Sequence, residues 1–367
     1  MDNQYPFTTT PEERAQRRAE RIAARKERER RRRKKMLLRL LPILALVVLL
    51  GFGMSRLSNS EDPQPPADDQ TQTTLPVFSP DTSTPEEHQA PAAPYALSPD
   101  DDTKQLTGDL SSQYAILIDL ENDRIVAEKN AHTVVSPASM TKILTILVAA
   151  EAIEEESQLQ DTVTIDLEIT DYAYVNDCSP SGFLLNESVP VEELFYGTIL
   201  PSGGDAALAL ARYVAGSHEA FADLMNQKVQ ELGLSDTARF SNCVGLYSED
   251  NVCTVYDMAL ILKAALDNDL CRQVLTTKIH DIPANEFHPD GLVLSNWFLR
   301  KIEDHVSEGL EVLGAKTGYV SQSGNCSASY AENSEGGRFI CVTADASGSW
   351  ACIKDHVAIY EQFCSVN

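Results

Sequence analysis

Two serines and a lysine stand together at the start of an apolar run, in the stretch SPASMTKIL that begins at Ser136. If this run is helical, Ser139 and Lys142 lie about one turn apart on the same face. A partly desolvated lysine has a lowered pKa and can accept the proton of a neighbouring hydroxyl. The spacing is therefore compatible with a serine nucleophile and its base, although the same spacing also occurs in helices whose lysine only reaches solvent.

Ser136 has a structural explanation of its own. A serine followed by Pro137 is a strong signal for a helix start, because serine caps the free backbone N–H groups and proline fits the first helical position. We therefore expect Ser136 to cap the helix, which leaves Ser139 for chemistry.

Two further motifs carry polar residues at positions that could face a cleft. Ser202 lies in the Pro/Gly-rich turn of LPSGGDAALALA, directly ahead of a predicted helix. Lys316, Thr317 and Gly318 lie in the predicted strand LGAKTGYV, where a glycine usually marks the close approach of another backbone or a ligand. Each motif alone also fits a helix cap or a solvated strand lysine, but together and in this order they indicate a site.

The elements that must position these residues follow the order strand, helix, strand. Two β-rich runs, 114–120 and 124–130, flank a short turn and predict a hairpin. Apolar residues at helical spacing then continue from Pro137 to about Leu270. Strand patterns return from about residue 309, before a closing amphipathic helix. We expect an α+β fold, with an antiparallel sheet flanked by helices and a mainly helical insertion between its first and last strands.

These motifs, together with stretches such as EELFYGTILPSGGDAALALA and FADLMNQKVQELGL, resemble the penicillin-binding, active-site-serine D,D-peptidases. The resemblance is closest to the low-molecular-mass D-alanyl-D-alanine carboxypeptidases of the peptidase S11 type, and it covers about residues 113–363. It implies a β-lactamase/transpeptidase-like fold and a serine-type carboxypeptidase that removes the terminal D-alanine from peptidoglycan stem peptides. It also implies binding of β-lactam antibiotics, with no metal and no cofactor.

The resemblance also implies catalytic roles. Ser139 would be the nucleophile that forms an acyl-enzyme, Lys142 its general base, and Ser202 a proton relay to the leaving D-alanine.

The same resemblance assigns the groups that would bind substrate. Lys316 and Thr317, followed by Gly318, would hold the terminal carboxylate, for which a fixed cation and a hydroxyl are suitable partners. The backbone N–H groups of Ser139 and Tyr319 would stabilise the oxyanion.

Two positions depart from the family pattern. Gly204 stands where the family's middle motif, Ser-x-Asn, has its amide, so we expect water or a differently held substrate there and predict that Gly204→Asn speeds D-alanine release. Cys243 and Val244 stand where relatives tend to carry Asn-Pro. A catalytically weak penicillin-binding scaffold and a β-lactamase therefore remain alternative functions. A Ser-His-Asp hydrolase and a zinc peptidase are disfavoured, because neither G-x-S-x-G nor H-E-x-x-H occurs.

The N-terminal region predicts a membrane anchor. The formal charge is −25, yet half of the 30 Lys and Arg residues precede residue 57. The basic segment 1–35 leads into the apolar segment 36–54, which we interpret as a single-pass transmembrane anchor with a cytoplasmic N-terminus, rather than a nucleic-acid-binding tail. A cleaved signal peptide is the alternative. Residues 55–105 are rich in Pro, Asp and Thr and predict a disordered tether, which leaves an extracellular peptidase domain at 106–367.

The 8 cysteines all follow the predicted anchor, where disulfides can form. Cys243 with Cys253, and Cys326 with Cys341, are the two pairs that we predict from their spacing and from the expected hairpin. Buried free thiols are the alternative.

Overall fold

A computed structural model describes residues 95–365 of the chain. Its contacts divide the chain into two units, 1–85 and 86–367. The predicted basic segment, the predicted anchor at 36–54 and most of the predicted tether lie outside the described residues. Among residues 95–365, no helix is both long enough and apolar enough to cross a bilayer.

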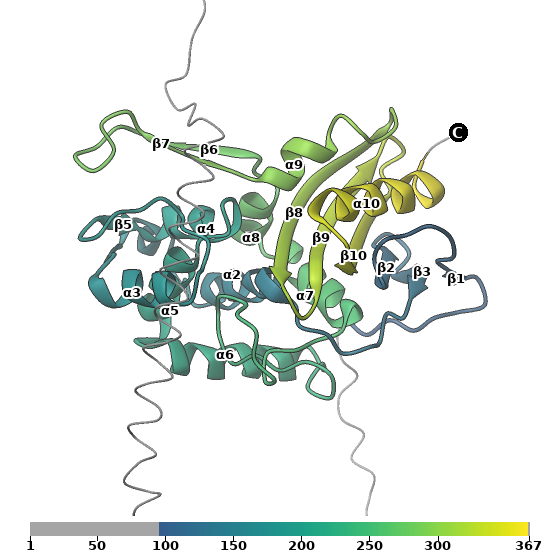
Figure 1. Ribbon diagram of the computed structural model, residues 1–367, viewed down its shortest axis with the longest axis horizontal. Helices are drawn as coiled ribbons and strands as arrows, with labels where there is room; N and C mark the ends of the chain where they lie inside the picture. The colour runs from purple at the N-terminus through teal and green to yellow at the C-terminus, as the bar shows by residue number, and fades with distance from the viewer. Residues whose placement is uncertain (1–94, 366–367) are drawn as a thin grey trace, which may run out of the picture. The chain divides into compact units, whose positions relative to one another are not determined.

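The centre of the domain is a six-stranded sheet with the order β1-β3-β2-β10-β9-β8 (Figure 1). Its strands are β1 (Lys104–Gln105), β2 (Tyr114–Asp119), β3 (Arg124–Lys129), β8 (Leu310–Val320), β9 (Gly324–Asn333) and β10 (Arg338–Ala346). All neighbours are antiparallel except the short β1, which runs parallel to β3. The predicted meeting of the first and last strands is confirmed, because β10 pairs with β2.

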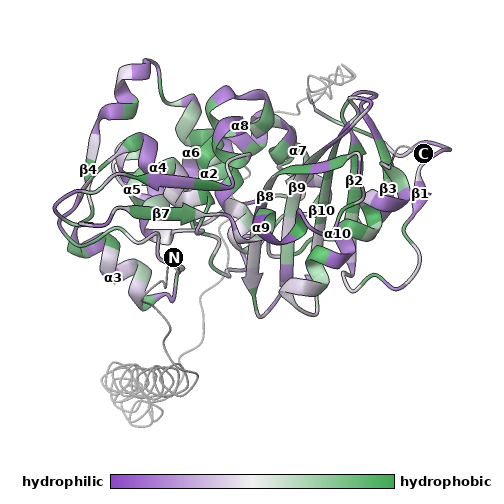
Figure 2. Ribbon diagram, turned by 90° about the horizontal axis from the view of Figure 1, so that it is seen from above, coloured by the Kyte–Doolittle hydropathy of each residue, from purple (hydrophilic) through white to green (hydrophobic). Residues whose placement is uncertain are grey.

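Alternate residues of the central strands contribute their side chains to two separate hydrophobic cores, one on each face of the sheet. Ile116 and Ile118 of β2 pack toward the helical block, whereas Ala115 and Leu117 pack toward the opposite face. Successive side chains of a strand point to opposite faces, so a strand that is buried on both sides must be apolar throughout. Figure 2 shows this as continuous hydrophobic colour along β2.

Helices cover both faces of the sheet. They are α2 (Thr141–Glu151), α3 (Leu167–Val175), α4 (Val191–Ile199), α5 (Gly204–Ala215), α6 (His218–Glu231), α7 (Val255–Asp267), α8 (Asp269–Leu275), α9 (Trp297–Ile302), α10 (Ser349–Phe363) and the 3₁₀ helices η1 (Ala138–Met140) and η2 (Glu156–Gln160). Helices α9 and α10 pack on one face, and the predicted helical insertion lies on the other (Figure 1). Within the insertion, α2 contacts helices on all sides and is buried from Thr141 to Ala150.

Two small sheets complete the fold and are not evident from the sequence. Strands β4 (Thr162–Thr164) and β5 (Ser188–Pro190) form one pair, and β6 (Ile279–Ile282) and β7 (Leu292–Ser295) form a hairpin before α9. These strands have three or four residues each, which is too short for a clear alternating pattern.

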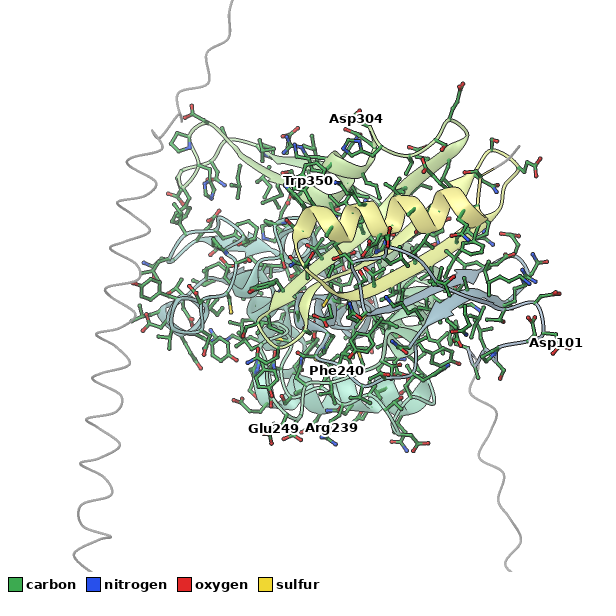
Figure 3. All side chains as sticks on the ribbon, turned by 45° about the vertical axis from the view of Figure 1, so that its right-hand side comes forward. Asp101, Arg239, Phe240, Glu249, Asp304 and Trp350 are labelled. Carbon is green, nitrogen blue, oxygen red and sulfur yellow. The ribbon has the colours of Figure 1, made fainter. Side chains whose placement is uncertain are left out.

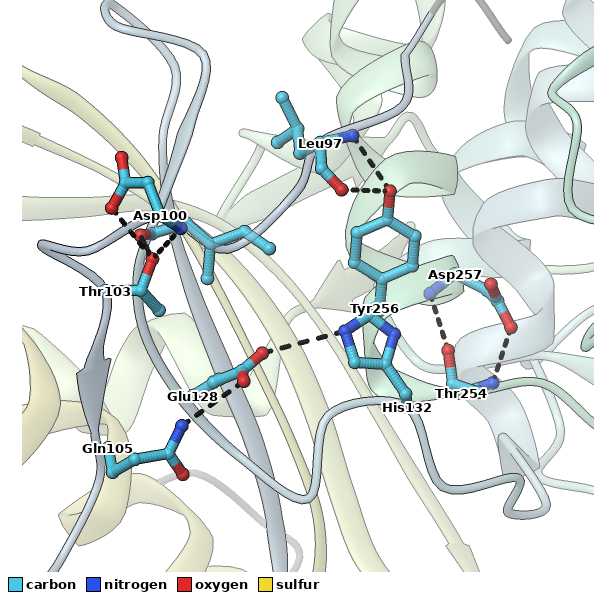
Figure 4. Close-up of polar contacts among 10 residues, drawn as sticks. Leu97, Asp100, Thr103, Gln105, Glu128, His132, Thr254, Tyr256 and Asp257 are labelled. Carbon is cyan, nitrogen blue, oxygen red and sulfur yellow. Dashed lines mark hydrogen bonds and ion pairs between the residues drawn. The ribbon is translucent and has the colours of Figure 1, made fainter.

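The described chain contacts the domain before residue 106. The backbone N–H of Leu97 donates to Tyr256 Oη at 2.9 Å, and the same hydroxyl donates to Leu97 O at 2.8 Å (Figure 4). Gln105 in β1 pairs with Glu128 of β3. The polar composition that predicts a tether up to residue 105 therefore extends into a segment that is hydrogen-bonded to the folded part.

The predicted capping role of Ser136 is wrong. Its hydroxyl has no hydrogen-bond partner, and α2 begins only at Thr141. Ala138 has a φ of 49°, a left-handed conformation that a regular right-handed helix cannot contain. The chain therefore makes a 3₁₀ turn at this point before the α-helix begins.

The two predicted disulfides are also wrong, because all eight cysteines are free. Cys326 and Cys341 lie on adjacent strands, but they belong to cores on opposite faces of the sheet, which separates their thiols. Sγ of Cys243 lies 3.3 Å from Nδ1 of His218 on α6 rather than bonded to Cys253.

We predict that the denatured, unreduced chain takes up eight alkylating labels, because each thiol is held apart from the others by the fold. Intact-mass measurement checks this, with a fully reduced sample as the control. Six or fewer labels in the unreduced sample would contradict the structure.

Candidate active site

Ser139 is presented at the edge of the helical block by η1. It is half-buried, and it follows Ala138, whose φ of 49° is costly for a residue with a Cβ. Such strain persists only where the surrounding structure fixes the backbone, and it is common next to functional side chains. The turn therefore holds Ser139 at a defined position instead of leaving it in a free helix terminus.

Lys142 lies beside this serine, and its side chain is buried, with 1% of the residue exposed. Its Nζ donates to Ser139 Oγ at 3.1 Å and to the backbone oxygen of Val244 at 2.7 Å. Burial penalises the charged amine and lowers the pKa of Lys142 to about 8. A base with this pKa is partly neutral near physiological pH and can take the Ser139 proton.

The segment between α6 and α7 supplies the second partner of Lys142. Asn242 Oδ1 accepts hydrogen bonds from the N–H groups of Gly245 and Leu246, which shapes a turn that directs two backbone oxygens at α2. In Figure 3, Phe240 of this segment points inward while Arg239 and Glu249 lie at the outer edge. Because Val244 contacts Lys142 through its backbone oxygen, a departure from the family residue at this position leaves the contact in place.

Ser202 and Lys316 form a second hydroxyl–amine pair in the same cavity. Ser202, with a φ of 66°, lies in the turn between α4 and α5 and accepts a hydrogen bond from Lys316 Nζ at 2.7 Å. Lys316 extends from β8 and also donates to Thr317 O at 2.8 Å. Burial, with the nearby charge of Lys142, holds the pKa of Lys316 well below its usual range.

Within residues 95–365, neither of these amines forms an ion pair with a carboxylate. Asp205 is the carboxylate that acts electrostatically on Lys142, but its Oδ1 accepts the N–H groups of Ser181 and Ala206 at 2.9 Å each. Two buried amines without a counter-ion favour an anionic group in the cavity. The site is therefore suited to a substrate that carries a carboxylate.

Gly318 allows β8 to lie directly against the turn that carries the nucleophile. A Cβ at this position would lie 2.8 Å from Ser139 N, 2.9 Å from Ala138 Cβ and 3.0 Å from Pro137 O. Only a residue without a side chain permits this approach. The backbone that follows, at Tyr319, is thereby placed on the same side of the cavity as the Ser139 N–H.

A cavity of about 470 Å³ joins these groups. Its lining includes the predicted site residues Ser139, Ser202, Thr317, Gly318 and Tyr319, while Lys142 and Lys316 reach them from beneath through hydrogen bonds. All the site residues that the sequence predicts are thus brought together.

Sequence reasoning missed the wall of the cavity that is formed by the start of α9 and the end of β7. Asn296 and Trp297 line it, and Asn296 Nδ2 donates to Ala315 O at 2.7 Å, which fixes β8 next to Lys316. Trp297 meets Trp350 of α10 edge to face, with ring centroids 6.0 Å apart, and Figure 3 shows Trp350 beside this wall. The one sequence signal was Asn296 as a helix cap ahead of WFLRKI.

Known proteins resemble this chain in sequence. Residues 100–348 match the family model described as D-alanyl-D-alanine carboxypeptidase. The chain is 30% identical over 237 residues to the D-alanyl-D-alanine carboxypeptidase DacF of Bacillus subtilis, which covers 64% of this chain and 57% of that protein. It is 34% identical over 215 residues to the carboxypeptidase DacC of Escherichia coli, which covers 57% and 50% respectively. The chain thus spans about half the length of the curated relatives it matches.

The fold has a counterpart among solved structures. The crystal structure of the Streptomyces K15 DD-transpeptidase superposes with a TM-score of 0.61 at 24% identity, and the match covers 70% of this chain and 99% of that one. This likeness establishes the β-lactamase/transpeptidase-like α+β fold that the sequence predicts, with the short parallel β1 added to the antiparallel sheet.

We predict that Gly318→Ala slows acylation of Ser139 by a penicillin at least about tenfold, because a displacement of reacting groups on the order of 1 Å can cost about a hundredfold. The added Cβ has no space against the backbone of Ser139 and must push β8 away from η1. Gly348→Ala is the matched control, since a Cβ there meets nothing within 4 Å. Equal rates for the two variants would contradict the assigned packing.

From the expected role of Lys142 as base, we predict that the acylation rate rises with pH and reaches half of its maximum near pH 8, because only the neutral amine can accept the proton and its pKa is lowered to about 8. Deprotonation raises the neutral fraction, so the rate increases as pH rises through this value. Lys142→Arg should abolish acylation at every pH, since a guanidinium stays protonated. A rate that is flat between about pH 6 and about pH 9 would show that another group is the base.

Proposed function

We propose that this chain, which belongs to the D-alanyl-D-alanine carboxypeptidase family, removes the terminal D-alanine from peptidoglycan stem peptides and is acylated by penicillins at Ser139. The observation that carries the proposal is the pairing of two hydroxyls with two buried amines in one cavity. Lys142 bonds to Ser139, and Lys316 bonds to Ser202, with no carboxylate bonded to either amine among the described residues.

Substrate binding begins with the terminal carboxylate. A carboxylate that enters beside Lys316 favours the charged form of this amine, which burial otherwise disfavours, and the Thr317 hydroxyl on the same strand can donate to the second carboxylate oxygen. Entry of the anion offsets the electrostatic cost of the two buried amines. The last peptide bond is then held in reach of Ser139.

Acylation follows on that bond. Ser139 Oγ attacks the carbonyl carbon of the penultimate residue and transfers its proton to Lys142. The negative charge on the carbonyl oxygen is stabilised by the N–H groups of Ser139 and Tyr319. The C–N bond breaks, and the proton reaches the leaving amine through Ser202, so that D-alanine departs and an ester remains on Ser139.

Deacylation reverses these roles with water as the nucleophile. Lys142 accepts a proton from water, the hydroxide attacks the ester carbonyl, and Ser139 recovers its proton when the ester bond breaks. A penicillin enters by the same route, because its strained amide meets Ser139 while its carboxylate meets Lys316. The C–N bond of the ring breaks and its nitrogen takes the proton, but this amine remains part of the acyl group on Ser139, so no leaving group departs and water is hindered from reaching the ester.

The experiment that tests the function incubates the full chain with a penicillin, maps the adduct, and measures D-alanine release from a peptide that ends in D-Ala-D-Ala. We expect an adduct on Ser139 and D-alanine release, both lost in Ser139→Ala. Lys316→Ala should raise KM more than it lowers kcat, since it removes a contact made by substrate and transition state alike. Ser136→Ala is the matched control, because its buried hydroxyl has no partner, and it should keep full activity.

The outcomes separate the alternative functions. No adduct and no D-alanine release would overturn the proposal. An adduct without release from the peptide would support a penicillin-binding scaffold, and fast turnover of the penicillin would support a β-lactamase.

A further inference from the structure

The space next to Gly204, where the family's middle motif carries a side chain, is occupied by another part of the chain. A Cβ at Gly204 would lie 2.5 Å from Cβ of Cys178 and 3.0 Å from its Sγ. Cys178 lies in the loop after α3, which packs against α5 (Figure 1). The expectation that water fills this space is therefore wrong, since the Cys178 side chain lies there.

Backbone hydrogen bonds hold this loop on both sides of the cysteine. The N–H of Cys178 donates to Ala173 O at 2.9 Å, and the N–H of Gly204 donates to Ser179 O at 2.8 Å. The buried carboxylate of Asp205 accepts the N–H of Ser181 at 2.9 Å. Hydrogen bonds to α3 and to the start of α5 therefore fix the backbone on both sides of Cys178.

Cys178 is also within electrostatic reach of the amine at the centre of the site. Burial is the main cause that lowers the pKa of Lys142, and Cys178, with Cys243 and Asp205, is near enough to act on that pKa in the opposite direction. Burial raises the pKa of the Cys178 thiol, so it is neutral at physiological pH and neither a competing nucleophile nor a base. A neutral thiol can still donate and accept weak hydrogen bonds.

The charged amine of Lys142 can donate one more hydrogen bond than it makes. Its Nζ donates to two acceptors, Ser139 Oγ and Val244 O, whereas an ammonium carries three N–H groups. In the family pattern, the side chain two residues after Ser202, at position 204, is the one available to orient this lysine. Here Gly204 has no side chain, and Cys178 reaches the same place from a segment more than twenty residues earlier in the chain.

We propose that Cys178 is a positioning residue of this site, which fills the place of a side chain at position 204 and holds the Lys142 amine toward Ser139. The inference rests on the proposed function. A thiol makes weaker hydrogen bonds than a carboxamide, so it fixes the base mainly by occupying space and leaves the neighbouring cleft less polar.

The first test exchanges the two side chains. Because a Cβ at position 204 overlaps Cys178, the faster reaction that the motif pattern predicts for Gly204→Asn is replaced by its opposite: this variant alone should lower the rate constant for acylation by a fluorescent penicillin at least about tenfold, since it displaces the loop. Cys178→Gly alone should also lower it, by leaving the space empty. Cys178→Gly combined with Gly204→Asn should recover most of the rate, a non-additive result expected only of residues that share one space.

The second test uses charge rather than volume. Cys178→Asp places a carboxylate near Lys142, which favours the ammonium and raises the pKa of the base, so the rising limb of the acylation pH profile should move about one unit or more to higher pH. Cys178→Asn is the neutral isostere and should leave the limb in place. If the loop had only a structural role, Cys178→Asp and Cys178→Asn would shift the rising limb of the pH profile equally.

Cys364→Ala is the control, because Cys364 is a buried free thiol in the core under α10, and its acylation rate and pH profile should match the parent chain. Thermal melting of every variant identifies losses that come from unfolding. A Gly204→Asn rate equal to that of the parent, or identical profiles for Cys178→Asp and Cys178→Asn, would overturn the inference. Failure of the parent chain itself to form an adduct would instead overturn the proposed function.

Discussion

Two lysine amines buried in one cavity, without a carboxylate bonded to either in the described part of the chain, are the constraint on which the rest of the site depends. Lys142 and Lys316 are 1% and 2% exposed, and within residues 95–365 each amine donates to a serine hydroxyl and to a backbone oxygen. Desolvation makes their charged forms costly, which suits one amine to the proposed role of base and the other to the proposed role of binding an anion. An arrangement so costly without a ligand is expected only where a ligand uses it.

The architecture serves to bring these amines together from distant parts of the chain. Lys142 comes from α2, in the middle of the helical block, and Lys316 comes from β8, the edge strand of the sheet. Between them, Gly318 allows strand backbone to approach the strained turn that carries Ser139. The helical insertion and the sheet therefore each contribute part of one site. The close packing of β8 against η1 also sets the distance between the site groups on the two parts.

The loop after α3 shows that the volume of a missing family side chain can be filled by a residue from another part of the chain. In the linear sequence, Gly204 only lacks the side chain that the family's middle motif carries. In three dimensions the same volume is filled by Cys178, and the loss of one side chain is matched by the gain of another. The Val244 position shows the complementary case, in which the backbone oxygen makes the contact with Lys142 while the side chain packs in the core.

The sequence by itself determined the order of the elements, the α+β class, and the residues Ser139, Lys142, Ser202 and Lys316, because periodicity and motif order are properties of the chain. It could not determine the 3₁₀ turn at Ala138, since the strained φ is imposed by the surrounding backbone and not by alanine. It also could not exclude bonding of Cys326 to Cys341, because which face of a sheet a residue occupies depends on strand register. Only the tertiary structure placed Cys178 against Gly204, because a contact between separate loops has no signature in local spacing.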